Sequence, residues 1–231
     1  MECKLNYEMR KNQQQKLFIK NYHPKVLQDK EWNEKKIGYD VQELLTTLND
    51  LSGIRVGDLI LSDLMLTSSN CHGIYAFYEG EQYKLHDANT TQNGATPKCW
   101  YVGKTSSVAL IGRIASHFTP RCTDYSNSLI KHIAYSLASE KDRQLIWDKS
   151  LSSNRDRWMK ADSFITKAFP VIQDLKIKVI IIENVYDDDT RKCIGILEKA
   201  LINELRPAFN YLKRFGNREY NICNNLIQKI Y

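Results

Sequence analysis

The run KIKVIIIE at residues 176–183 restricts the fold most, because it is the clearest strand in the chain. Valine and isoleucine dominate it, and such residues favour strands. Two other apolar and aromatic segments, GIYAFYEG at residues 73–80 and CWYVGKT at residues 99–105, also have strand character. Between them lies a polar stretch, 81–98, with Asn-Gly and a proline, which predicts a long loop. We therefore expect these two strands to form an antiparallel hairpin.

Apolar residues at helical spacing lie before, between and after these strands. A helix is expected to open at 40–43, with Asp40 as its cap and a glutamate three residues later. A second helix is predicted over 107–118, and a third from about Thr190 to Leu205, ending before Pro207. The order of strands and helices predicts an α+β fold, a small antiparallel three-stranded sheet flanked by helices.

Composition divides the chain into an arm, a main domain and a tail. Residues 1–36 are polar and rich in Lys and Gln, and they read as a helical or partly disordered arm. We expect segment 1–70 to be an N-terminal arm with a helical extension, 71–215 the main domain and 216–231 a C-terminal tail. Within the main domain, residues 121–170 mix aromatic and charged positions and are predicted to be a helical insertion.

The chain has 231 residues and a net charge of +6, and basic residues outnumber acidic ones near both ends. That distribution suits contacts with phosphates, although ordinary solvated surface explains it equally well. None of the six cysteines forms a C-x-x-C pair, and no apolar run is long enough to cross a bilayer. We expect reduced thiols, a cytoplasmic protein and no membrane partner.

Three sets of side chains are candidates for chemistry. Glu198 stands on the apolar stripe of the last helix, where a carboxylate is costly unless a positive group meets it. Glu198 has two interpretations. It forms a structural ion pair with an arginine, or it serves as a metal ligand or general base. Arg113 and His117 share one helix face, either as an exposed basic patch or as a phosphate-neutralising group beside a proton acceptor.

Two tyrosines complete the candidates. Tyr75 shares a strand face with Gly73 and Phe77, and Tyr101 shares one with Gly103. Both tyrosines are either core residues or members of a site, and glycines beside them would leave room for a ligand's backbone to approach a phenol.

The order of these signals resembles the GIY-YIG nuclease superfamily. The matching strings are GIYAFY, YVGKT, GRIASHF and LEKALINELRPAFN, and the Val of YVG is the conservative departure from the family pattern. The resemblance covers about residues 73–118 and 176–210, and it leaves the insertion uncovered.

This resemblance implies a metal-dependent phosphodiesterase with one Mg²⁺ or Mn²⁺ per active site, held by Glu198. Tyr75 would act as general base in the form of a phenolate. Lys104 would help to depress a tyrosine pKa, and activity would rise on the alkaline side. The other carried-over residues would orient and neutralise the scissile phosphate (Tyr101, Arg113 and His117) or brace the site (Asn210).

The segment YLKRFGN after the asparagine resembles restriction enzymes of this superfamily, which also carry an N-terminal extension and an insertion. We therefore expect a type II restriction endonuclease that cuts double-stranded DNA as a homodimer. The alternatives are a loosely specific phage-defence, mobile-element or repair nuclease, and a DNA-binding module without catalysis. Candidate base readers are the basic residues of the insertion (Arg121, Lys131, Arg143, Arg155, Arg157 and Lys160).

Overall fold

The structure is a computed structural model. It describes residues 16–59, 72–85, 98–105, 110–117, 129–139, 141, 162–182, 188–210 and 227–229. These ranges form an α+β fold with one mixed sheet and several helices. Among the described helices, none combines the length and apolar character needed to span a membrane.

Three strands that the sequence predicts lie side by side in the sheet. β6 (Lys176–Ile182) pairs antiparallel with β3 (His72–Tyr78), and β3 pairs antiparallel with β5 (Cys99–Thr105). These strands and their antiparallel pairing are confirmed.

Two further strands enlarge this sheet. β1 (Ile19–Tyr22) runs parallel to β6, and β2 (Ile54–Arg55) runs antiparallel to it, followed by the short 3-10 helix η1 (Val56–Asp58). The sheet has five strands in the order β1-β6-β3-β5, with β2 also on β6. The prediction of a three-stranded, purely antiparallel sheet is therefore wrong. β1 has only four residues, and Lys20 and Asn21 are exposed, so its local pattern matched a polar arm.

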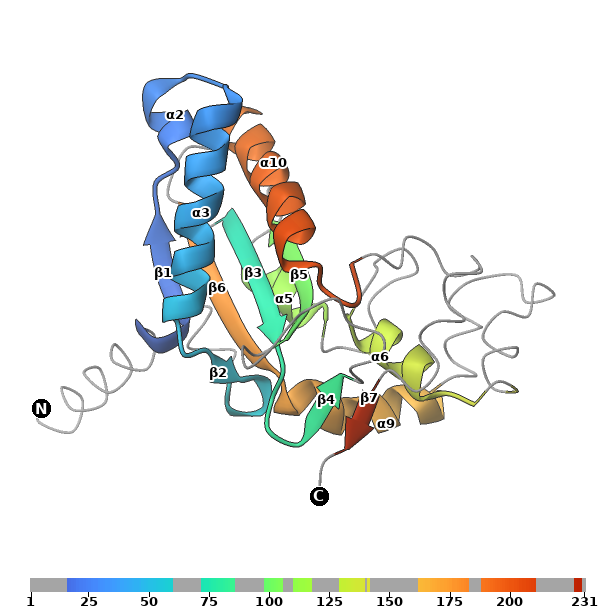
Figure 1. Cartoon of the computed structure of the whole chain (residues 1–231). Helices are drawn as coiled ribbons and strands as arrows, with labels where there is room; N and C mark the ends of the chain where they lie inside the picture. The colour runs from blue at the N-terminus through green and yellow to red at the C-terminus, as the bar shows by residue number, and fades with distance from the viewer. Residues whose placement is uncertain are drawn as a thin grey trace, which may run out of the picture.

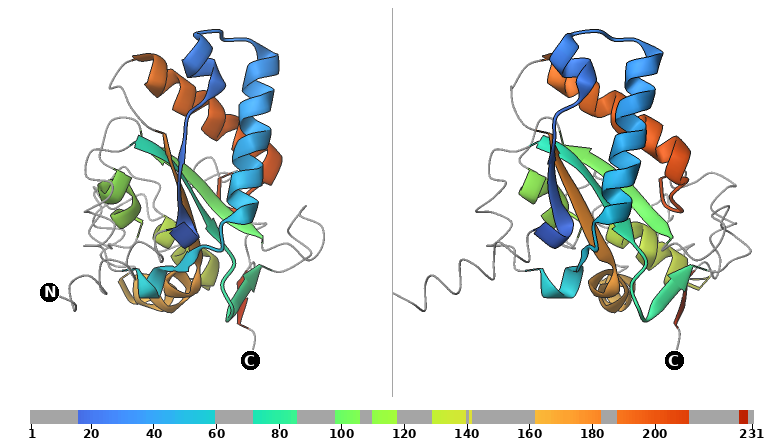
Figure 2. Two further views of the ribbon diagram at one scale, coloured as in Figure 1. Left: turned by 90° about the vertical axis from the view of Figure 1, so that its left-hand side faces the viewer. Right: turned by 60° about the vertical axis from the view of Figure 1, so that its left-hand side comes forward.

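Helices cover both faces of the sheet, as Figures 1 and 2 show. α3 (Glu34–Asp50) and α10 (Asp188–Leu205) pack on one face. α5 (Leu110–Ala115), α6 (Leu129–Leu137) and α9 (Asp162–Asp174) pack on the other. Each face carries its own buried apolar cluster, so the sheet is the central layer of three.

The predicted last helix is confirmed as α10, which ends before Pro207. The predicted helix at 107–118 is described as α5 over its central part, with Ile114 fully buried, and Phe118 lies outside the described residues. α6 and α9 give the predicted insertion its helical character. Most of the candidate base readers lie outside the described residues, and the side chain of Lys131 does too.

The first long helix, α3, begins earlier than the sequence analysis expects. Asn33 is its N-cap, and the side chain of Asn33 accepts a hydrogen bond from the backbone N–H of Lys36 at 2.9 Å. Asp40 lies within the helix and is fully buried, so its assignment as the cap of this helix is wrong. The apolar stripe that follows is confirmed, because Val41 and Leu44 are buried.

Asp40 instead supports the short helix α2 (Lys25–Asp29). Its carboxylate accepts hydrogen bonds from the backbone N–H groups of Lys25 at 2.8 Å and Val26 at 3.1 Å. The hydroxyl of Tyr22 donates to the same carboxylate at 2.6 Å. These bonds satisfy a buried charge and the first N–H groups of a helix together.

The predicted loop 81–98 contains a strand. β4 (Tyr83–Leu85) pairs antiparallel with β7 (Ile227–Lys229), which lies in the predicted tail. The loop assignment is therefore wrong for these residues, because a three-residue strand has too short a pattern to detect. The division of the chain at residues 70 and 215 stays a prediction, although β1 and β2 from the first segment belong to the main sheet.

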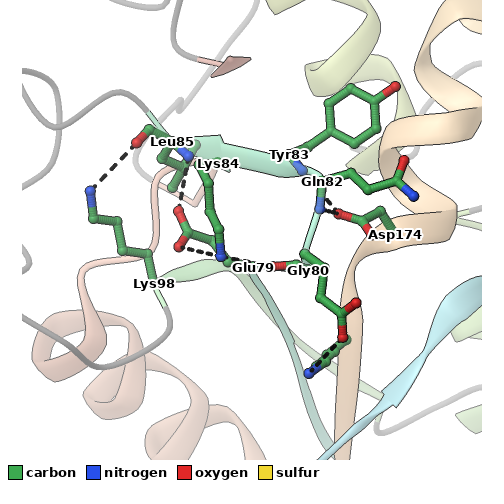
Figure 3. A network of polar contacts seen from close by, with 10 residues as sticks. Glu79, Gly80, Gln82, Tyr83, Lys84, Leu85, Lys98 and Asp174 are labelled. Atoms are coloured by element: carbon green, nitrogen blue, oxygen red, sulfur yellow. Dashed lines mark hydrogen bonds and ion pairs between the residues drawn. The ribbon is translucent and has the colours of Figure 1, made fainter. Parts of the chain in front are cut away.

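Two buried carboxylates hold β4 against the main fold (Figure 3). Asp174, the last residue of α9, accepts from the backbone N–H groups of Gln82 at 2.8 Å and Tyr83 at 3.0 Å. Glu79 accepts from the N–H of Leu85 at 2.9 Å. These bonds tie the start of β4 to α9 and the end of β4 to the residue after β3.

Candidate active site

The two glycine-tyrosine motifs meet across neighbouring strands, because Tyr75 on β3 lies opposite Gly103 on β5. A Cβ atom at Gly103 would stand 2.4 Å from both Cζ and the hydroxyl oxygen of Tyr75. The space that the glycine leaves is therefore filled by the phenol itself. The expectation that it admits a ligand's backbone is wrong.

The Tyr75 hydroxyl lies 2.7 Å from Nε2 of His117, in the turn after α5. The other ring nitrogen of His117, Nδ1, accepts a hydrogen bond at 2.9 Å from the backbone N–H of Leu129, the first residue of α6. Tyr75 and His117 are both fully buried. Burial, together with the charges of Arg113 and His132, lowers the pKa of His117 well below its ordinary value, so the ring is neutral at pH 7.

Arg113 of α5 approaches both phenols. His117 lies in the turn after α5, so the expectation that the two residues share one helix face is wrong. The half-buried guanidinium of Arg113 hydrogen-bonds the oxygens of Tyr75 and Tyr101. Burial raises the pKa of Tyr75 well above its ordinary value, and the charge and hydrogen bond of Arg113 oppose that rise. The pKa of Tyr101 is raised for the same reason and is also opposed by Arg113. Both phenols are thus protonated in this arrangement, with one cation beside them.

Glu198 stands on α10 and forms an ion pair with Lys104 of β5, with 3.3 Å between Oε2 and Nζ. Burial raises the pKa of Glu198, and Lys104 and then Arg113 lower it. Gly195, one turn earlier, makes room for the lysine, since a Cβ there would lie 2.9 Å from Nζ. The partner of the carboxylate is therefore a lysine, whereas the sequence analysis considered an arginine.

Glu198 also belongs to the phenol cluster electrostatically, because its charge acts on the pKa values of Tyr75 and Tyr101. The structure therefore brings Tyr75, Tyr101, Arg113 and His117 together. Glu198 contacts Lys104 and acts on the two phenols through its charge. Lys104 contacts Glu198, and the positive charge that acts on the pKa of Tyr75 comes from Arg113.

Asn210 has a different position, on the outer edge of β5. Its Oδ1 accepts from the backbone N–H of Val102 at 2.6 Å, and its Nδ2 donates to the Val102 carbonyl at 2.7 Å. The N–H of Phe209 also donates to the carbonyl of Trp100 at 2.9 Å. Phe209 and Asn210 thus hydrogen-bond to the free edge of β5, and Asn210 braces the strand that carries Tyr101 and Lys104.

Two groups join the site that the sequence analysis did not name as candidates, although it placed Phe77 on the strand face of Tyr75. Phe77 packs edge-on against the rings of Tyr75 and His117, with centroids 5.9 and 5.6 Å apart. Its place two residues after Tyr75 was a usable signal, because such residues share a strand face. The N–H of Leu129 left no such signal, since every non-proline residue carries that group.

The chemistry of this cluster suits phosphate and at most one cation. In the described part of the chain, no group of three or more His, Cys, Asp or Glu side chains is placed to hold a metal. Glu198 offers one carboxylate that is 20% exposed, which fits a hard cation that keeps most of its waters. Such an ion would compete with the ammonium of Lys104 for the same oxygen.

Compared with known proteins, the chain matches no family model, no curated protein and no solved structure.

Proposed function

We propose that this protein is a metal-dependent endonuclease that hydrolyses phosphodiester bonds in double-stranded DNA. The observation that carries the proposal is that Tyr75, Tyr101, Arg113 and His117 gather in one cluster, with the charge of Glu198 on α10 acting on both phenols. Their order in the sequence resembles that of GIY-YIG nucleases, and the antiparallel run β6-β3-β5 is compatible with the sheet of that fold. The strands β1 and β2 are additions to it.

In this proposal Arg113 binds the scissile phosphate. A guanidinium pairs with phosphate oxygens in a bidentate manner and neutralises charge that develops during transfer. Arg113 now donates to two phenols that are buried, so DNA binding would draw it from the phenols to the phosphate. That movement would expose the Tyr75 hydroxyl to the attacking water.

Tyr75 is the proposed general base, acting as a phenolate after its proton has passed to solvent. An O–H bond of the attacking water breaks, and its proton passes to the Tyr75 oxygen. The new P–O bond forms while the bond from phosphorus to the leaving oxygen breaks, and the leaving oxygen keeps the electron pair. Glu198 would hold one Mg²⁺ or Mn²⁺, which supplies charge stabilisation to the phosphate when it is bound.

Within this activity we propose a sequence-specific type II restriction endonuclease that works as a homodimer. The support is the resemblance of segment 211–217, which lies outside the described residues, and the presence of both an N-terminal extension and a helical insertion. A palindromic site would require two active sites, hence two copies. A loosely specific phage-defence, mobile-element or repair nuclease is the alternative with the same chemistry.

A second candidate function, DNA binding without catalysis, is favoured by one observation. Glu198 is already neutralised by Lys104, and Tyr75 is fully buried, as expected of structural groups. The two functions differ in what the Glu198 carboxylate does.

Purified full-length protein incubated with unmethylated, mixed-sequence DNA and Mg²⁺ separates these candidates. The matched pair is Glu198→Gln and Glu204→Gln, since Glu204 lies on the same helix and is exposed. Discrete fragments that vanish with chelator and with Glu198→Gln, yet persist with Glu204→Gln, would support the restriction enzyme. A smear with the same controls would favour the loosely specific class. DNA binding without any cutting would contradict the nuclease proposal.

A further inference from the structure

The two ring nitrogens of His117 have different partners, and this difference fixes where the ring carries its proton. The backbone N–H of Leu129 points at Nδ1 from 2.9 Å. An N–H group can only donate, so Nδ1 must present its lone pair. A neutral imidazole has one N–H, and that hydrogen is therefore on Nε2.

The proton on Nε2 then determines the direction of the hydrogen bond to Tyr75. Nε2 lies 2.7 Å from the phenol oxygen, so His117 donates and Tyr75 accepts. Arg113 donates to the same oxygen. Donors aimed at a phenol oxygen favour its ionised form over its neutral form, against the burial that raises the pKa of Tyr75. In the proposed reaction Arg113 turns to the phosphate, so the bond from His117 is the one that remains on this oxygen. The phenol's own hydrogen is directed away from both donors.

The surroundings oppose a second proton on the ring. His117 is fully buried, and burial together with the charges of Arg113 and His132 lowers its pKa. Its Nδ1 also faces the first N–H of α6, the positive end of a helix. An imidazolium here would point its Nδ1–H at the N–H of Leu129. It would also place a positive charge close to the guanidinium of Arg113 and to the positive end of α6.

We propose that His117 is a positioning residue, locked by the backbone of α6 as a neutral Nε2–H donor that supports the Tyr75 phenolate, and that it never accepts the proton. This rests on the proposed nuclease function for its catalytic meaning, whereas the tautomer itself follows from the two hydrogen bonds. The proton taken from water stays on the Tyr75 oxygen, and His117 keeps its single proton throughout. The expectation that His117 accepts or relays a proton is replaced.

The inference gives the insertion a second role. Residues 121–170 were expected to contact DNA, yet their first described helix reaches the site through the N–H of Leu129. Removing or shifting α6 would then alter the phenol's environment without changing any of the predicted catalytic side chains.

Nitrogen NMR of the full-length protein tests the tautomer directly, because the two neutral forms and the imidazolium give distinct ¹⁵N shifts. The signal of His117 is assigned by its loss in His117→Gln, among five histidines. We expect the neutral Nε2–H form at pH 7. An Nδ1–H tautomer or an imidazolium would overturn the inference, whether or not the protein cuts DNA.

Proline and alanine at Leu129 test the role of α6. Leu129→Pro removes the donor at the first helical position, where proline is tolerated, and Leu129→Ala loses similar packing but keeps the N–H. We expect the proline variant to show a mixture of tautomers and the alanine variant to show Nε2–H alone. Identical spectra from the two variants would refute the lock by α6.

Glutamine and alanine at His117 test the donor role in cutting. Glutamine can donate near the position of Nε2 but cannot accept a proton, so His117→Gln should cut faster than His117→Ala by about 10- to 100-fold. Equal loss in both would contradict the donor role. A wild-type protein that does not cut would instead refute the proposed function and leave the NMR result to decide the tautomer.

Discussion

Gly103→Ala is the substitution whose effect follows most directly from the structure. The new Cβ would stand 2.4 Å from Cζ and from the hydroxyl oxygen of Tyr75. That ring is fully buried and packs against the rings of Phe77, Tyr101 and His117, which limits where it can move. It must retreat by about 1 Å to reach ordinary van der Waals contact, which is enough to break its 2.7 Å hydrogen bond with His117.

Over-packing of a buried position costs about 1–3 kcal/mol, so we expect Gly103→Ala to lower the free energy of unfolding by that amount. The backbone itself adds no strain, because Gly103 lies within a strand and accepts a side chain in its conformation. Urea denaturation measures the change, and the ¹⁵N signal of His117 reports the lost hydrogen bond.

Gly38→Ala is the matched control, since a Cβ at this helical position would meet nothing within 4 Å. It should stabilise the protein by about 0.5–1 kcal/mol, because alanine favours helices over glycine. Wild-type stability together with an unchanged His117 signal in Gly103→Ala would refute the placement of the Tyr75 ring over Gly103.

Four other predictions concern separate residues. Asp40→Ala leaves several buried donors unpaired and should cost about 3–5 kcal/mol, measured by thermal unfolding, whereas a loss below about 1 kcal/mol would contradict its role at α2. Asn210→Ala removes two bonds to Val102 and should cost about 1–3 kcal/mol in the same assay, and a neutral change would refute the brace. The pKa of Glu198 is raised, so the folded state penalises its ionised form, and Glu198→Gln should be more stable than the wild type at pH 7. This gain in the free energy of unfolding should fade as pH falls through the raised pKa, and a loss of stability at pH 7 would contradict the reasoning. The pKa of His117 is lowered in the folded state, so the unfolded state takes up a proton first and stability should fall as pH drops below about 6.5. His117→Gln should make the free energy of unfolding depend less on pH in this range, measured by unfolding at several pH values.

Long segments with a strong period were predictable from the sequence, and contacts between distant segments were not. β3, β5, β6 and α10 have continuous apolar or amphipathic patterns that local chemistry dictates. β1 has four residues and β4 three, too few for a period, and each is a strand only because a distant partner lies beside it. Such long-range pairing leaves little trace in the local sequence.

Asp40 shows why a correct residue type can be placed in the wrong role. An aspartate before an apolar stripe has the signature of a helix cap, yet α3 begins at Glu34 with Asn33 as its cap. The carboxylate does satisfy the start of a helix, but that helix is α2, which lies earlier in the chain. The sequence indicated that the Asp40 carboxylate binds the N–H groups at a helix start, but it did not indicate which helix.

The candidate site shows the same division. The sequence identified the side chains that gather, because their types and order are informative, and it placed Tyr75 and Tyr101 on adjacent strands. It did not indicate that Lys104 pairs with Glu198, or that the Tyr75 ring occupies the space above Gly103. Both depend on how side chains from different elements share space, which a one-dimensional pattern does not encode.

The rate of DNA cutting by Tyr75→Phe and Tyr78→Phe tests the central claim most directly. Both changes remove one buried hydroxyl from the same strand, but Tyr78 packs on the opposite face of the sheet, and its hydroxyl makes no hydrogen bond. Single-turnover cutting with Mg²⁺ should fall by at least about 100-fold in Tyr75→Phe and stay near the wild-type rate in Tyr78→Phe. Equal rates in the two variants would contradict the account, because the Tyr75 hydroxyl would then have no part in the chemistry.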